Sequence, residues 1–180
     1  VRGGGLLAVL ALAGAGAGAV GRTLKNRFGA AESRANLTLP AASEPLAVIP
    51  DGVNVGLDGI APFTTPNADF YRIDTALSVP QLSRSDWQLK IHGMVDREIT
   101  YRFEDLDRFE VVEKLVTLTC VSNPIGGELI GNASWTGYRA RDLLAEAGVH
   151  KDADMVLSMS IDGFTAGSPV EALTDGRDSL

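Results

Sequence analysis

A single cysteine, Cys120, is the residue of this sequence best suited to metal or nucleophilic chemistry. It ends an apolar run, VTLTC, and a loop of small and polar residues, VSNPIGG, follows at once. Glycine lets a backbone approach a ligand closely, and asparagine supplies both hydrogen-bond donors and acceptors. A thiolate at this position, with Ser122 and Asn123 beside it, is a soft and negatively charged ligand for a metal centre.

Two other interpretations of Cys120 are compatible with the sequence. A lone cysteine in an apolar run is often a small buried residue without any chemical role. A nucleophilic cysteine needs a neighbouring base, and the sequence places neither histidine, His92 or His150, near it.

Composition and charge exclude several classes of site and argue against one class of partner. One cysteine excludes an internal disulfide and any all-cysteine zinc site, and the two histidines are too far apart for a metal-ligand motif. The net charge is −7, and the few residues charged before Glu32 are basic, so the remainder is strongly acidic. An acidic body argues against nucleic acid as a partner.

The elements that position Cys120 are predicted from periodicity. Alternation in WQLKIHGMV indicates a half-buried strand with His92 on its polar face, and ITYRF completes a hairpin with it. FEDLDRF then predicts a short helix.

The second half of the chain continues the alternation of strands and helices. VVEKLVTLTC predicts a strand buried on both faces towards its end, and DMVLSMSI a second buried strand. Between them, TGYRARDLLAEAGV predicts a helix with Leu143 in the core and Gly148 as its C-cap, and Trp135 just before it is a second expected core residue. The predicted class is α+β, with mixed sheets and short helices.

The N-terminal region is predicted to lie outside the globular domain. An uncharged run, LLAVLALAGAGAGAV, with basic flanks predicts an export signal or membrane anchor over residues 1–31. Frequent proline and glycine predict an extended linker over 32–68, and the folded domain is expected over 69–180, continuing beyond Leu180.

The same region contains a weak dinucleotide-binding pattern. Gly16, Gly18 and Gly21 satisfy G-x-G-x-x-G. The basic, soon broken sequence behind them does not continue as the second half of a strand and helix unit, so we attribute the match to composition. A nucleotide-dependent oxidoreductase is kept only as a weak alternative.

Several segments, taken in order, resemble one known family. They are FYRIDTALSVP, then W-x-L-x-I-x-G-x-V, then VTLTCVSN, then GNASWTGYRARDLL. At these spacings they are similar to the molybdopterin-binding domain of the sulfite oxidase family, including its exported bacterial members. The resemblance covers roughly Asn67 to Leu180 and implies that fold.

The resemblance also implies a set of site residues. Cys120 would be the catalytic metal ligand to molybdenum, whose other ligands are the two dithiolene sulfurs of the pterin and oxygens. The segment before it would lie along the pterin and its phosphate, with a surface ion pair as the alternative role for Arg72. The implied cofactor-binding residues are Phe70, Tyr71, Arg72, Asp74, Ser122, Asn123 and Ser160.

The implied activity is oxygen-atom transfer to or from a small oxide: sulfite, a sulfoxide or an N-oxide. The sulfite oxidases carry Arg-Asn-His in the FYRIDT segment and an Arg soon after the metal cysteine, whereas here Arg72 is followed by Ile73 and Asp74, and Asn123 by Pro124. Two groups that would help to bind sulfite are therefore absent. No haem-attachment motif is present, so a separate haem or quinone-linked membrane partner is expected to exchange the electrons. The implied location is the membrane or the outside of the cytoplasm, and a membrane-tethered binding or assembly module without metal is the alternative function.

Overall fold

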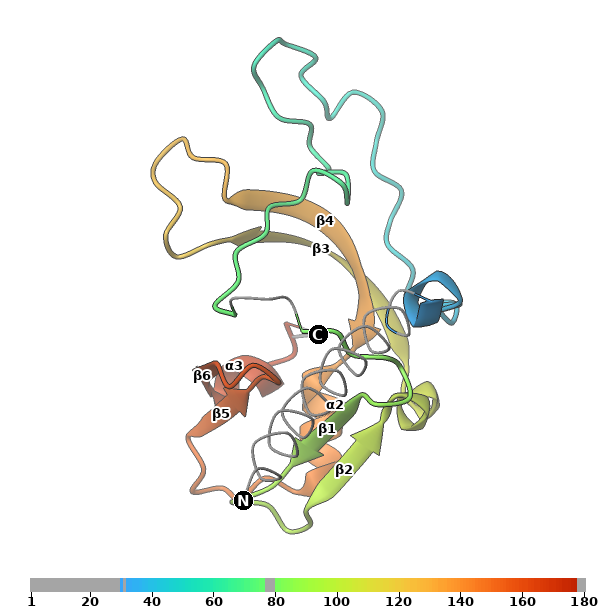
Figure 1. Ribbon diagram of the computed structural model, residues 1–180, viewed down its shortest axis with the longest axis vertical. Helices are drawn as coiled ribbons and strands as arrows, with labels where there is room; N and C mark the ends of the chain where they lie inside the picture. The colour runs from blue at the N-terminus through green and yellow to red at the C-terminus, as the bar shows by residue number, and fades with distance from the viewer. Residues whose placement is uncertain (1–29, 31, 77–79, 178–180) are drawn as a thin grey trace, which may run out of the picture.

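The computed structural model describes residue 30, residues 32–76 and residues 80–177 of the chain. These residues form three separate two-stranded antiparallel sheets joined by short helices (Figure 1). The predicted α+β class is confirmed. The N-terminal apolar run and its glycine pattern lie outside the described residues, and no described helix is both long and apolar enough to cross a membrane.

The first sheet is the predicted hairpin. β1 (Gln88–Ile91) pairs with β2 (Ile99–Arg102), and the short helix follows as a 3-10 helix, η1 (Phe103–Arg108). His92 is exposed, as its place on the polar face predicted.

The core of the described residues lies where this hairpin meets α2 (Ala140–Ala147). Tyr101, Leu106 and Leu143 are buried at its centre, which confirms the prediction for Leu143. Five partly buried residues pack around them: Trp87, Ile91, Ile99, Phe109 and Tyr138.

Gly148 ends α2 in the way the sequence predicted. Its φ of 71° is left-handed, and its N–H donates to the carbonyls of Leu144 and Ala145. A Cβ on Gly148 would lie 2.5 Å from a carboxylate oxygen of Asp96, and the left-handed backbone by itself favours glycine at this position. Asp96 in turn donates its backbone N–H to the Gly148 carbonyl, at 2.8 Å, and so joins the β1–β2 turn to the helix.

The second sheet is a long, curved hairpin that projects away from the core (Figure 1). β3 (Val111–Thr119) pairs over its whole length with β4 (Ile130–Tyr138), a strand that the sequence analysis did not predict. Val111 and Val112 are buried, whereas Leu118 is 41% exposed. The prediction that β3 is buried on both faces towards its end is therefore wrong, because no described helix or second sheet packs on the far half of this hairpin.

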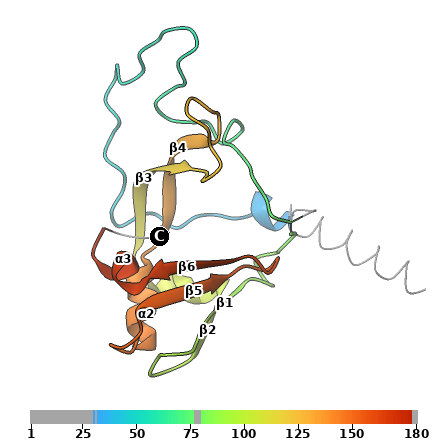
Figure 2. The same cartoon turned by 90° about the vertical axis from the view of Figure 1, so that its left-hand side faces the viewer.

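The third sheet consists of β5 (Met155–Met159) and β6 (Thr165–Pro169), with the short helix α3 (Val170–Thr174) behind it. It lies with β1, β2 and α2 at the opposite end of the molecule from the tip of the long hairpin (Figure 2). Met155, Leu157 and Met159 are all more than half exposed. The prediction of a buried strand here is also wrong, since these side chains share one face and no described element packs on it.

The predicted linker, residues 32–68, contacts both edges of the long hairpin. Glu44 forms a parallel bridge with Val112, and its carboxylate binds the buried Arg139. Farther along, Thr65 donates its backbone N–H to the carbonyl of Asn132 at 2.7 Å. Between these contacts the chain loops out beyond the hairpin (Figure 1). The domain boundary near Asp69 stays a prediction, although part of the preceding segment is fastened to the domain.

Candidate functional site

Cys120 lies at the tip of the long hairpin, directly after β3. The last pair of the ladder is Thr119 with Ile130, and one further bond, from the Cys120 N–H to the Leu129 carbonyl at 2.9 Å, extends it. The chain then turns, because the Asn123 N–H donates to the Cys120 carbonyl at 2.9 Å. The strand thus fixes the backbone of Cys120 and leaves its side chain half-exposed at the start of the loop.

Asn123 holds the loop that follows. Its side-chain oxygen accepts a hydrogen bond from the Leu129 N–H at 2.8 Å, which links the two ends of the loop. A second turn is closed by the Gly127 N–H and the Pro124 carbonyl at 2.8 Å. The structure therefore gives Asn123 a bracing role beside Cys120, and its predicted contact with a cofactor stays a prediction.

Ser122 acts on the thiol itself. Its Oγ lies 3.1 Å from Cys120 Sγ, within hydrogen-bonding distance. The Ser122 hydroxyl, and to a smaller extent the Ser122 backbone N–H, lower the pKa of Cys120 because they stabilise the thiolate. The thiolate is the form that binds metals, so the loop favours the reactive form of this cysteine.

Phe70 brings the second predicted segment to the hairpin. Its ring packs edge-on against Trp135, with centroids 5.8 Å apart, and covers Gly131 of β4. Gly131 pairs with Leu118, two residues before Cys120. Tyr71 stacks on Phe70 at 5.3 Å, so the start of the FYRIDT segment lies near the cysteine. Trp135 is 39% exposed under this ring, and the prediction that it is a core residue is therefore wrong.

Arg72 and Asp74 pair with each other. Arg72 Nε lies 2.8 Å from Asp74 Oδ2, and both side chains are exposed. This is the surface ion pair expected as the alternative role for Arg72, and such pairs contribute little to stability. A phosphate can replace Asp74 on the guanidinium at small cost, so the predicted role of Arg72 stays open.

Ser160 follows β5 directly and lies beside the end of the FYRIDT segment. The carboxylate of Asp162 accepts a hydrogen bond from the Ser160 hydroxyl and another, at 2.9 Å, from the hydroxyl of Thr75. Thr75 and Asp162 were not among the predicted site residues. The one signal was the Asp-Gly pair after a predicted strand, which is typical of a turn but does not identify its partner.

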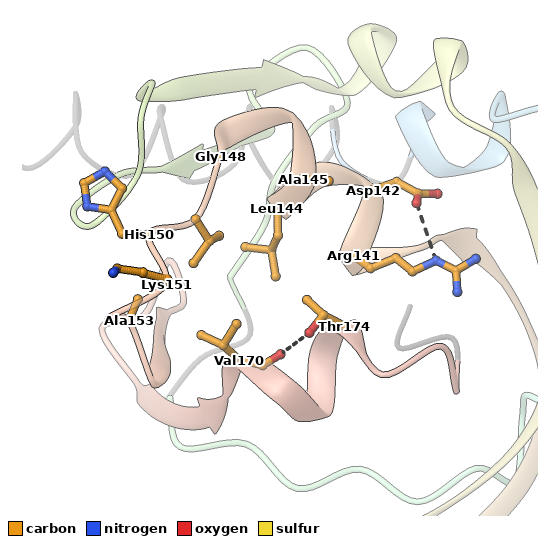
Figure 3. Close-up of a pocket in the computed structure, with 11 residues that line it drawn as sticks. Arg141, Asp142, Leu144, Ala145, Gly148, His150, Lys151, Ala153, Val170 and Thr174 are labelled. Atoms are coloured by element: carbon orange, nitrogen blue, oxygen red, sulfur yellow. Dashed lines mark hydrogen bonds and ion pairs between the residues drawn. The ribbon is translucent and has the colours of Figure 1, made fainter.

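A groove of about 570 Å³ lies apart from these residues, between α2 and α3. Leu144 and Val170 point into it, and the Arg141 side chain at its edge is held by Asp142 at 3.5 Å (Figure 3). None of the predicted site residues lines it.

Comparison with known proteins decides the family. Residues 76–180 match the family described as the oxidoreductase molybdopterin binding domain. The chain belongs to this family. Cys120, Ser122, Asn123 and Ser160 lie inside the matched range, whereas the predicted cofactor segment from Phe70 to Asp74 lies just before it.

Two relatives agree with this assignment. The chain is 32% identical over 85 residues to an uncharacterized oxidoreductase, YuiH, of Bacillus subtilis (strain 168), covering 47% of this chain and 41% of that protein. The fold is similar to the crystal structure of the sulfane dehydrogenase SoxCD from Paracoccus pantotrophus, with a TM-score of 0.50 and 26% identity. That match covers 53% of this chain and 28% of the other. The chain thus covers less than half of either relative.

The expected family, its α+β fold, its oxidoreductase class and its molybdopterin cofactor are confirmed by these comparisons. The donor set around Cys120 fits this cofactor. Among the described residues, no three His, Cys, Asp or Glu side chains form a group that could hold a metal ion. The pterin brings its own sulfurs, so a single protein thiolate completes the set.

We expect Gly131→Ala to displace Phe70 from the molybdopterin-binding domain's hairpin. A Cβ at this position would lie 2.5 Å from the Phe70 ring. The ring must move, and such overpacking costs about 1–3 kcal/mol of the free energy of unfolding. Urea denaturation measures this cost. In a Phe70→Ala background the same change should cost almost nothing, and an equal cost in both backgrounds would contradict the account.

Proposed function

We propose that this chain is the cofactor-binding part of an enzyme that transfers an oxygen atom to or from a small oxide. When bound, the molybdenum cofactor supplies the redox chemistry of that transfer. The observation that carries the proposal is the position of Cys120: a half-exposed thiol with a lowered pKa, two residues from the strand position that Phe70 covers.

Each group of residues has a separate task in this proposal. Cys120 holds the metal, and the hydrogen bond from Ser122 stabilises the thiolate form of its side chain. Phe70 and Tyr71 offer stacked rings to the pterin, while Arg72 offers a guanidinium to its phosphate. Ser160 lies at the far end of the FYRIDT segment, where its hydroxyl and that of Thr75 both donate to Asp162.

Among small oxides, a neutral sulfoxide or N-oxide suits the loop better than sulfite. The loop from Val121 to Leu129 contains Glu128 and neither lysine nor arginine. In this proposal the guanidinium of Arg72 binds the phosphate of the pterin, so it does not serve the substrate. A sulfite dianion would meet a carboxylate without a cation beside it, whereas a neutral oxide avoids this cost. Reduction of the oxide consumes two electrons and two protons, and it releases water with the reduced product.

We further propose that the electrons come from a separate haem or quinone-linked membrane partner, and that the protein works at the membrane or outside the cytoplasm. The support is in the sequence: a basic-flanked apolar run over residues 6–20, and no haem-attachment motif in the 180 residues.

The test is the molybdenum content of the full-length protein, expressed in a host that makes the pterin. We expect roughly one molybdenum per chain, since the single thiolate serves a single cofactor. A Val121→Ala variant, which alters a fully exposed neighbour of Cys120, is the matched control and should keep the metal. A wild-type protein without molybdenum, from a host shown to load another molybdoenzyme, would contradict the proposal.

A further inference from the structure

The carboxylate of Asp162 joins two parts of the chain that are 87 residues apart. Its Oδ1 accepts the Ser160 hydroxyl and, at 3.2 Å, the backbone N–H of Phe164. Its Oδ2 accepts the Thr75 hydroxyl at 2.9 Å. One oxygen therefore shapes the turn between β5 and β6, and the other holds the end of the FYRIDT segment.

The turn that carries Asp162 is itself well fastened. The Ser160 N–H donates to the Phe164 carbonyl at 2.9 Å, and the Gly163 N–H donates to the Ser160 carbonyl at the same distance. The turn continues the β5–β6 ladder, whose last pair is Met159 with Thr165. Asp162 is thus presented from a fixed base, which is what a positioning group needs.

The segment that Asp162 holds has little else to fix it. Residues 70–76 make no backbone hydrogen bond to any other residue that the structure describes. Phe70 anchors the beginning of the segment against Gly131, and Thr75 anchors its end through Asp162. Tyr71, Arg72 and Asp74, the predicted pterin contacts, lie between these two anchors.

We propose that Asp162 is a positioning residue for the cofactor: by binding Thr75 it holds the segment 70–75 in place and slows release of the pterin. This inference rests on the proposed function of that segment. The hydrogen bonds from Ser160 and Thr75 lower the pKa of Asp162, so the carboxylate is ionised at neutral pH and accepts strong, charge-assisted bonds. Asp162 does not touch the metal; it acts through Thr75.

The test compares Asp162→Asn and Thr75→Val with the wild type in two measurements. The first is trypsin cleavage after Arg72, followed by mass spectrometry on full-length protein from a host that lacks the pterin. The second is the rate of pterin release from loaded protein, followed by the fluorescence of the oxidised pterin. Loss of one hydrogen bond should raise both rates by about threefold to tenfold. Thr75→Ser keeps the hydroxyl and should restore wild-type rates.

Asp175→Asn is the matched control, because Asp175 also accepts a backbone N–H two residues on and has a lowered pKa, yet lies outside the segment. It should change neither rate. Double replacement of Thr75 and Asp162 should release pterin no faster than either single variant. If the wild type contains pterin and the variants release it at the wild-type rate, this inference alone is overturned. Absence of pterin from the wild type would overturn the proposed function and this inference together.

Discussion

Replacement of Cys120 by serine is expected to reduce turnover of a small sulfoxide or N-oxide by at least about a thousandfold. Losses of this size follow when one member of a group of residues that act together in catalysis is removed. Serine keeps the size of the side chain and can keep the bond to Ser122, whose Oγ lies 3.1 Å from Cys120 Sγ. It does not supply a soft thiolate at neutral pH. Activity would be measured with a reduced dye as electron donor.

The fold of Cys120→Ser should be intact even though its turnover is lost. The ladder bond beyond Thr119 uses the backbone of Cys120, not its side chain, and the side chain is half-exposed. Thermal unfolding of Cys120→Ser should therefore match the wild type, and Val121→Ala should match it in both activity and stability. Turnover by Cys120→Ser at a rate close to that of the wild type would remove the cysteine from the site.

The largest effect on stability is expected from Tyr101→Ala, at about 3–5 kcal/mol of the free energy of unfolding. Tyr101 is 1% exposed and stands at the centre of the core, packed against Leu106 and Leu143. Its ring also meets Phe109 edge-on, with centroids 5.9 Å apart. Alanine leaves a cavity between β2 and α2 that neither element can close. Urea denaturation gives the difference, and a loss below that of Tyr101→Phe would contradict this view of the core.

Tyr101→Phe separates the ring from the hydroxyl. The hydroxyl donates to Glu146 at 3.0 Å, and its loss should cost about 1 kcal/mol. Burial, helped by Glu146, raises the pKa of Tyr101 from 10.0 to about 12. The folded state therefore keeps the proton of the Tyr101 hydroxyl to a higher pH than the unfolded state does. The stability it contributes is complete below pH 10 and is lost as the pH rises towards 12. The advantage of the wild type over Tyr101→Phe should shrink over this range.

Local signals in the sequence predicted the elements that depend on them. The hairpin β1–β2 follows from alternation, and α2 with its Gly148 cap follows from helical spacing and a glycine at the end. Neither needs information from distant residues. The position of Cys120 at the end of β3 was predicted for the same reason, since an apolar run stops there.

The features that the sequence did not predict depend on contacts between residues far apart in the chain. β4 contains Gly131, Asn132 and Gly137, residues with low strand propensity, and it is a strand because β3 pairs with it along its whole length. The burial of β3 was misjudged because an apolar run does not say whether another layer covers it. Likewise, no local pattern connects Thr75 to Asp162 or Glu44 to Arg139.

The proposed function rests above all on Cys120 as the protein's ligand to molybdenum. The most direct test is X-ray absorption at the metal edge, on loaded wild-type protein and on the Cys120→Ser variant prepared in the same way. We expect the variant that retains the pterin to show one sulfur ligand fewer than the wild type, with an oxygen or no atom in its place. The same number of sulfur ligands in both proteins would contradict it.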